Sequence, residues 1–249
     1  MDKLKKVVYA LVGVTPPMAG FDVKAVATDI DGTLTDRSYK LSLKAIEALR
    51  YLESEGIPVI LVSGNAYPLV KALQMYLGCS GAVVCEGGAV VEYKDAIRIL
   101  SSKDRALDAL RRLKGIYGCS IVESWCNEYR LVDVALDRTI SREEVYRVLK
   151  DYPDLKLWDS GFAYHILERS IDKGVGLRVA ADLMKIRVGD IAAVGDSEND
   201  IPMFRIAGFS VAVGDASEDV KRNASLTVYK PNGEGFAEAV NLILAMKKR

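Results

Sequence analysis

The segment Val23-Lys24-Ala25-Val26-Ala27-Thr28 is followed directly by Asp29-Ile30-Asp31-Gly32-Thr33, and this junction decides the predicted fold. Its first part is short and mostly apolar, which is typical of a strand that is buried on both faces of a sheet. Its second part places two carboxylates and a glycine immediately after that strand. Ligands of open parallel sheets bind beyond the carboxyl ends of the strands, so the junction also predicts a binding site.

The same kind of junction occurs twice more along the chain. Ser63-Gly64-Asn65 follows the apolar run 57–62, and Gly195-Asp196-Ser197-Glu198-Asn199-Asp200 follows the apolar run 191–194. If these strands are parallel, their carboxyl ends meet at one edge of the sheet. Carboxylates that are close together cannot all stay ionised without a compensating cation. We therefore expect a divalent cation, and Mg²⁺ suits a site that leaves coordination places for water and phosphate oxygens, here among Asp29, Asp31, Asp196 and Asp200.

These residue types together favour phosphoryl chemistry. Once a cation and Lys173 neutralise the cluster, one carboxylate is free to attack phosphorus. The backbone at Gly32 and Gly64 can approach phosphate oxygens because glycine has no side chain in the way. Each feature alone has a simpler interpretation, since an Asp-Gly pair often forms a turn, Ser63 can cap a helix and a lone lysine is usually solvated. Their joint occurrence in this order favours a catalytic site.

The rest of the chain predicts an α/β fold, with a Rossmann-like parallel-sheet core and a small inserted α+β cap domain. Short apolar runs alternate with amphipathic segments on both sides of the insertion. In and just after the insertion, helices are expected over 103–113 and 141–149, and strands over 120–123, 129–134, 155–158 and 163–167. We assign residues 1–19 to an N-terminal extension, 20–101 and 163–249 to the core, and 102–162 to the cap.

The composition argues against several kinds of partner. The chain has 249 residues, with 34 Lys and Arg against 34 Asp and Glu, so no field of one sign attracts nucleic acid or an anionic membrane. The apolar run 7–14 is too short to span a bilayer, and residues 1–17 are expected to be dispensable for activity. We expect a cytoplasmic monomer or homodimer with four reduced thiols, which show no metal-ligand spacing: Cys79, Cys85, Cys119 and Cys126.

The motifs resemble those of the haloacid dehalogenase (HAD) superfamily of phosphohydrolases. The segment 29–34 matches the first motif, Ser63 the second, Lys173 the third and the segment 195–200 the fourth. The insertion between Ser63 and Lys173 resembles the α/β (type IIB, Cof-like) cap. Within that branch, Ser63-Gly64-Asn65, the position of His165 and the short cap look most like archaeal phosphoglycolate phosphatase.

The resemblance implies a Mg²⁺-dependent phosphatase that acts on a small phosphorylated metabolite, most specifically 2-phosphoglycolate, through an aspartyl phosphate. Asp29 would be the nucleophile and a metal ligand. Asp31 would bind the metal through its backbone carbonyl and act first as general acid, then as general base. Asp196 and Asp200 would hold the metal directly or through water.

Substrate binding follows from the same resemblance. Arg130 in the cap is assigned to a substrate carboxylate, because a guanidinium binds carboxylates bidentately. His165 is interpreted as a structural hydrogen-bonding residue, and Trp125 and Trp158 as core residues. The chain departs from the family pattern by lacking the usual Asn between Glu86 and Gly87, which concerns a contact of the substrate loop. Asn65 replaces a common Arg at the mouth of the site, and this replacement favours a small substrate. The phosphoryl group itself would be bound by Ser63, Gly64, Asn65 and Lys173.

Three alternatives stay open on the sequence alone. The first is a phosphatase for sugar phosphates or for a broad range of phosphorylated metabolites. The second is a mutase or phosphotransferase, which would pass the phosphoryl group from Asp29 to another hydroxyl. The third is a non-catalytic phosphoacceptor domain in which the aspartyl phosphate persists. The second carboxylate at Asp31 and the inserted cap argue against this third alternative.

Overall fold

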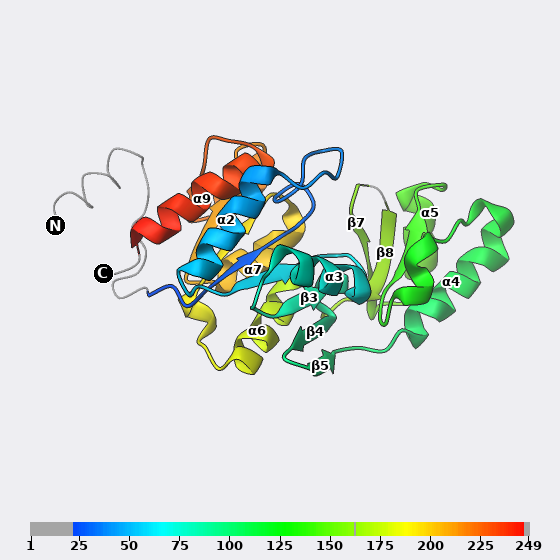
Figure 1. Ribbon diagram of the computed structural model, residues 1–249. Helices are drawn as coiled ribbons and strands as arrows, with labels where there is room; N and C mark the ends of the chain where they lie inside the picture. Colours follow the sequence, from blue (N-terminus) through cyan, green and yellow to red (C-terminus); the bar gives the residue numbers. More distant parts are fainter. Residues whose placement is uncertain (1–21, 162, 247–249) are drawn as a thin grey trace.

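The computed structural model describes residues 22–161 and 163–246, which form a large core and a smaller unit beside it (Figure 1). The expected extension over 1–19 lies outside these residues. The core is built on an eight-stranded sheet in the order β11-β10-β9-β1-β2-β3-β4-β5. Its strands are β1 (Ala25–Thr28), β2 (Val59–Val62), β3 (Val83–Cys85), β4 (Val90–Tyr93), β5 (Ala96–Ile99), β9 (Ile191–Gly195), β10 (Phe209–Ala212) and β11 (Leu226–Thr227).

The strands from β11 to β3 are parallel, which confirms the predicted α/β core. β1 lies between β9 and β2, and all of its residues are buried, as expected for a continuous apolar run. β4 and β5 add an antiparallel hairpin that we did not predict. Lys94 and Asp95 form its turn with φ values of 48° and 67°, where Asn-Gly is the usual sequence signal.

Helices cover both faces of the core sheet (Figure 1). α2 (Leu43–Ser54) packs against α9 (Asn232–Met246) on one face, and α6 (Lys173–Met184) packs against α7 (Ile201–Ile206) on the other. α3 (Tyr67–Leu77) packs on β3, and α8 (Glu218–Asn223) contacts β10. None of the helices within 22–161 and 163–246 combines the length and the apolar character needed to cross a bilayer.

The smaller unit is an antiparallel sheet in the order β6-β8-β7, made of β6 (Val134–Asp137), β7 (Leu155–Asp159) and β8 (Ala163–Glu168). α4 (Asp104–Tyr117) and α5 (Arg142–Leu149) cover its outer face, so the sheet lies between these helices and the core (Figure 1). Its hydrophobic cluster is separate from that of the core. β8 is the central strand of this sheet although we assigned 163 onward to the core, so we propose a cap that ends near residue 168.

Two of the predicted cap strands are wrong. The segment 120–123 contributes only an isolated bridge from Glu123 to Leu136, and the strand expected over 129–134 begins at Val134 instead. The backbone N–H groups of 131–133 donate to the carboxylate of Glu86, which belongs to the core. Since a side chain of the core occupies these donors, this segment cannot use them to pair as a strand.

Candidate active site

Three neighbouring strands bring the predicted site residues to one edge of the core sheet. Thr28 in β1 is paired with Leu61 in β2 and with Val194 in β9. The residues that follow these strands therefore emerge side by side. The backbone N–H of Asp29 donates to the carbonyl of Val194 at 3.0 Å, which continues the ladder into the site. The register thus places Asp29 between the loops that carry Ser63 and Asp196.

Lys173 joins two of the carboxylates. It is the first residue of α6, and the N-cap residue Asp172 accepts a hydrogen bond from the N–H of Val175. Lys173 Nζ donates to Oδ1 of Asp29 and to Oδ1 of Asp200, both at 2.6 Å, and the side chain is buried. Burial lowers the pKa of Lys173, but the charges of Asp200 and Asp29 raise it more, so the net pKa lies above its usual value. Lys173 is therefore a buried cation with two carboxylate partners.

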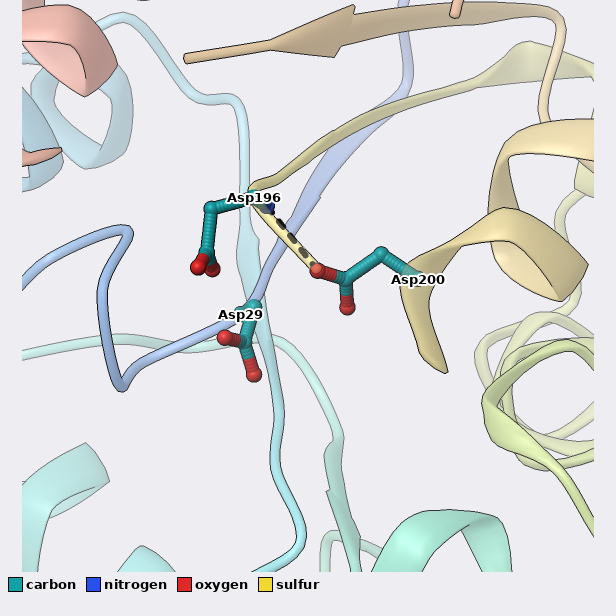
Figure 2. A group of neighbouring side chains, drawn as sticks. All are labelled: Asp29, Asp196 and Asp200. Atoms are coloured by element: carbon teal, nitrogen blue, oxygen red, sulfur yellow. Dashed lines mark hydrogen bonds between the residues drawn. The ribbon is translucent and has the colours of Figure 1, made fainter. Parts of the chain in front are cut away.

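Asp29, Asp196 and Asp200 form a compact carboxylate cluster (Figure 2). One oxygen of each lies within 4.8 Å of the others. The backbone N–H of Asp196 donates to Oδ2 of Asp200 at 3.0 Å, and the Thr33 hydroxyl donates to Oδ1 of Asp196 at 2.8 Å. Gly32 has a φ of 86°, and a Cβ there would lie 2.5 Å from Oδ2 of Asp196. Only glycine fits where this loop passes the carboxylate.

The electrostatics of the cluster fit a divalent metal ion. Burial raises the pKa of Asp29 well above its usual range, against the opposing charge of Lys173, and Asp200 and Asp196 raise it further. Burial and the charge of Asp200 likewise raise the pKa of Asp196. One ammonium does not neutralise three neighbouring carboxylates, two of them buried and Asp196 half-buried. Their hard oxygen donors are the ligand type of Mg²⁺ and similar cations.

Asp31 lies in the loop after β1 and is hydrogen-bonded by the loop after β2. Asn65 Nδ2 donates to Oδ2 of Asp31 at 2.7 Å and to Oγ of Ser63 at 3.1 Å. Ser63 Oγ also accepts the backbone N–H of Asn65 at 3.0 Å. Burial raises the pKa of Asp31, although Lys173 and the hydrogen bond from Asn65 act in the opposite direction. A carboxyl group with a raised pKa is suited to both donating and accepting a proton.

A cavity of about 740 Å³ lies where the core meets the cap. Ser63 and Asp200 are fully buried and do not line it. The site residues that do line it are Asp29, Asp31, Gly64, Asn65, Lys173 and Asp196. The structure therefore brings together every predicted site residue of the core, some at the cavity wall and some behind it.

The cap supplies the opposite wall. Trp158 of β7 packs against the hydrophobic core, as expected, but it also lines the cavity, and a Cβ on Gly64 would lie 2.0 Å from its ring atom Cη2. The expectation that Trp125 is a core residue is wrong, because its side chain is 78% exposed. Sequence reasoning also missed Thr33 and Lys156 as site residues. For Lys156 the available signal is the alternation of side chains along β7, which needs a correct strand assignment.

Arg130 does not line this cavity. It is buried, and its Nη1 donates to both oxygens of Asp133 at 2.7 and 2.9 Å and to the carbonyl of Gly64 at 3.0 Å. Asp133 is also hydrogen-bonded to Nδ1 of His165 at 2.7 Å, and the His165 ring stacks on Trp158. In this structure the guanidinium joins the cap to the loop after β2 and is not presented to a substrate carboxylate. His165 makes the buried hydrogen bonds expected of it.

Glu86 gives the first testable prediction. Burial, followed by the charge of Asp133, raises its pKa to about 7, although three backbone N–H groups lower it. The pKa of a glutamate in the unfolded chain is about 4.3, so between about pH 4.3 and 7 the carboxyl group of Glu86 is protonated in the folded chain and ionised in the unfolded one. We therefore expect the free energy of unfolding to fall as pH rises through that window, by up to about 3 kcal/mol from this group. In Glu86→Gln, the free energy of unfolding measured with urea should change less with pH in that window. If it falls with pH as steeply as in the wild-type protein, the raised pKa of Glu86 is contradicted.

The fold and the carboxylate–lysine site define a class of protein. Residues 26–117 and 131–240 match the model of the haloacid dehalogenase-like hydrolase family, and the chain belongs to that family. A crystal structure from Thermoplasma acidophilum has a TM-score of 0.82 and 28% identity, and the match covers 90% of this chain and 100% of that one. A HAD subclass IIB sugar phosphatase matches with a TM-score of 0.75 over 90% of this chain and 100% of its own; at 19% identity it shows the fold alone.

Two relatives align with most of the chain and have the same name. The chain is 39% identical over 218 residues to the phosphoglycolate phosphatase of Methanothermobacter thermautotrophicus, which covers 88% of this chain and 97% of that protein. It is 40% identical over 225 residues to the phosphoglycolate phosphatase of Archaeoglobus fulgidus, with coverages of 90% and 98%. At these coverages the alignments include both the core and the cap.

Proposed function

We propose that this protein is a Mg²⁺-dependent phosphoglycolate phosphatase, which hydrolyses 2-phosphoglycolate to glycolate and phosphate through an aspartyl phosphate. The observation that carries the chemistry is the bridge from Lys173 to Asp29 and Asp200, at 2.6 Å each, beside Asp196. The substrate is supported by the relatives that match the core and the cap. A cytoplasmic location is part of the proposal, because the cysteines show no pairing pattern.

The first half-reaction transfers the phosphoryl group to the protein. Lys173 holds Oδ1 of Asp29, which leaves Oδ2 to attack phosphorus. The bond from phosphorus to the glycolate oxygen breaks, and Asp31 gives its proton to that leaving oxygen. Lys173 and the backbone at Gly64 stabilise the charge on the phosphoryl oxygens, whereas the N–H of Gly32 donates to Oγ1 of Thr35 at 3.1 Å.

The second half-reaction returns the protein to its starting state. Asp31, now ionised, takes a proton from water while the water oxygen attacks phosphorus. The bond between phosphorus and Asp29 breaks and inorganic phosphate leaves. Asp29, Asp196 and Asp200, with the Asp31 carbonyl, would hold Mg²⁺, which neutralises charge on the phosphoryl oxygens when bound. Trp158 of the cap lines the cavity opposite Asp29.

The carboxylate cluster predicts that Mg²⁺ stabilises the folded protein. A ligand at about 100 times its Kd adds about 2.7 kcal/mol to stability, which for a chain of this size raises the melting temperature by roughly 5–10 °C. Differential scanning fluorimetry with MgCl₂ against EDTA measures this. In Asp196→Asn most of the shift should disappear, and an unchanged shift in that variant would place the stabilising metal elsewhere.

A phosphatase with a wider substrate range is the second candidate, favoured by the cavity of about 740 Å³, which is large for a two-carbon substrate. Phosphate release from phosphoglycolate, sugar phosphates and nucleotides, with Mg²⁺ or EDTA, separates the two. Mg²⁺-dependent release with a clear preference for phosphoglycolate supports our proposal. Equal release from all substrates supports the wider range. Formation of a new phosphate ester when a sugar acceptor is added would show a phosphotransferase.

A further inference from the structure

The cap sheet presents one of its faces to the cavity. Along β7, Leu155 and Leu157 are buried in the cluster under α4 and α5. Side chains alternate between the faces of a strand, so Lys156 and Trp158 project from the opposite face, toward the core. Both residues line the cavity that also contains Asp29. A cationic side chain therefore stands on the cap wall of the site.

Lys156 is hydrogen-bonded to the segment that directly precedes Lys173. Its Nζ donates to the carbonyl oxygen of Ile171, two residues before Lys173. Its partner in β8 is Leu167, whose Cδ1 would lie 3.5 Å from a Cβ on Gly87 in the loop after β3. Lys156 thus belongs to the part of the cap that lies directly against the core.

Three cations line the cavity among the described residues, and two of them are otherwise engaged. Lys173 is bound by two carboxylates. Arg142 is exposed, stacks on the Tyr146 ring at 5.5 Å and donates to its hydroxyl. Lys156 is half-buried and has a neutral carbonyl as its hydrogen-bond acceptor. An ammonium has three donors, so Lys156 retains capacity for an anionic ligand.

We propose that Lys156 binds the carboxylate of the substrate and so sets the preference for phosphorylated hydroxy acids. This inference rests on the proposed function and assigns to Lys156 the role that we predicted for Arg130. Partial burial weakens solvent screening, so a carboxylate gains more from Lys156 than from the exposed Arg142. Burial lowers the pKa of Lys156 against the opposing charge of Asp172, and a bound carboxylate would also raise it.

A pair of substrates isolates this contact. Ethyl phosphate has the length of 2-phosphoglycolate but no carboxylate, so the ratio of kcat/KM for the two reports carboxylate recognition alone. In Lys156→Met we expect kcat/KM for phosphoglycolate to fall about 10- to 100-fold, the range of a hydrogen bond to a charged group. Ethyl phosphate should change by less than about twofold. Lys156→Arg should restore part of the preference, and Arg142→Gln should change both substrates by less than about threefold.

The arms of the experiment separate two failures. If the wild-type protein does not prefer phosphoglycolate over ethyl phosphate, the proposed function fails, and this inference fails with it. If the wild-type protein shows the preference and Lys156→Met keeps it, only the inference is overturned. An equal loss for both substrates also overturns it, because Lys156 would then act by positioning the segment before Lys173. Melting temperatures of the variants show whether each one is folded.

Discussion

Asp29→Asn should abolish phosphate release, with a fall in kcat of about 10³-fold or more, as is usual when a nucleophile is removed. The amide oxygen of asparagine is a poor nucleophile, so the aspartyl phosphate does not form. The side chain keeps its shape and one acceptor for Lys173. The cluster loses one of its crowded carboxylates, whose pKa burial raises, so unfolding is not the expected cause of the loss. The melting temperature without metal should stay equal or rise.

A matched change provides the control for this prediction. Asp182→Asn makes the same chemical substitution at an exposed position of α6 and should leave kcat within about twofold. Phosphate release from phosphoglycolate, with the two variants at equal concentration, gives the comparison. Retention of more than a tenth of the activity in Asp29→Asn would show that another group attacks phosphorus.

The parallel core and its active-site edge were predictable because they depend on local signals. Each strand of the site is a short apolar run, and the polar residues follow it directly, as at Asp29, Ser63 and Asp196. A parallel sheet then brings these positions together without any knowledge of the loops. The order β9-β1-β2 supplies the adjacency that the sequence only suggests.

The errors in the cap come from contacts between distant residues. The apolar pair Leu131 and Val132 suggests a strand, but Glu86 binds the backbone there from the core, and the strand starts later. Arg130 has the chemistry of a carboxylate ligand, yet its surroundings include Asp133, three residues away and equally buried. Nothing in the local pattern shows that these side chains turn inward. The role of Lys156 depends on the register of β7 with β8, which a sequence does not state.

The second large effect that we expect is a loss of stability in Asp133→Ala, because the carboxylate of Asp133 is buried. Asp133 is 1% exposed and accepts hydrogen bonds from Arg130 at 2.7 and 2.9 Å. Burial raises the pKa of Asp133, but the hydrogen bond from His165 and the charge of Arg130 lower it by more. The net pKa therefore lies below its usual value, and Asp133 stays ionised. Removing this carboxylate leaves the Arg130 guanidinium buried without its counter-ion. Such losses cost about 3–5 kcal/mol.

Urea unfolding at neutral pH measures the cost, and an exposed ion pair of the same cap is the control. Arg105 donates to both oxygens of Asp154 at 2.9 and 2.8 Å, but these side chains are 53% and 42% exposed. Asp154→Ala should therefore lower the free energy of unfolding far less than Asp133→Ala does. Equal costs for the two variants would mean that water reaches Asp133 when the cap moves. A large difference would show that the ion pair of Arg130 and Asp133 is buried in solution as well.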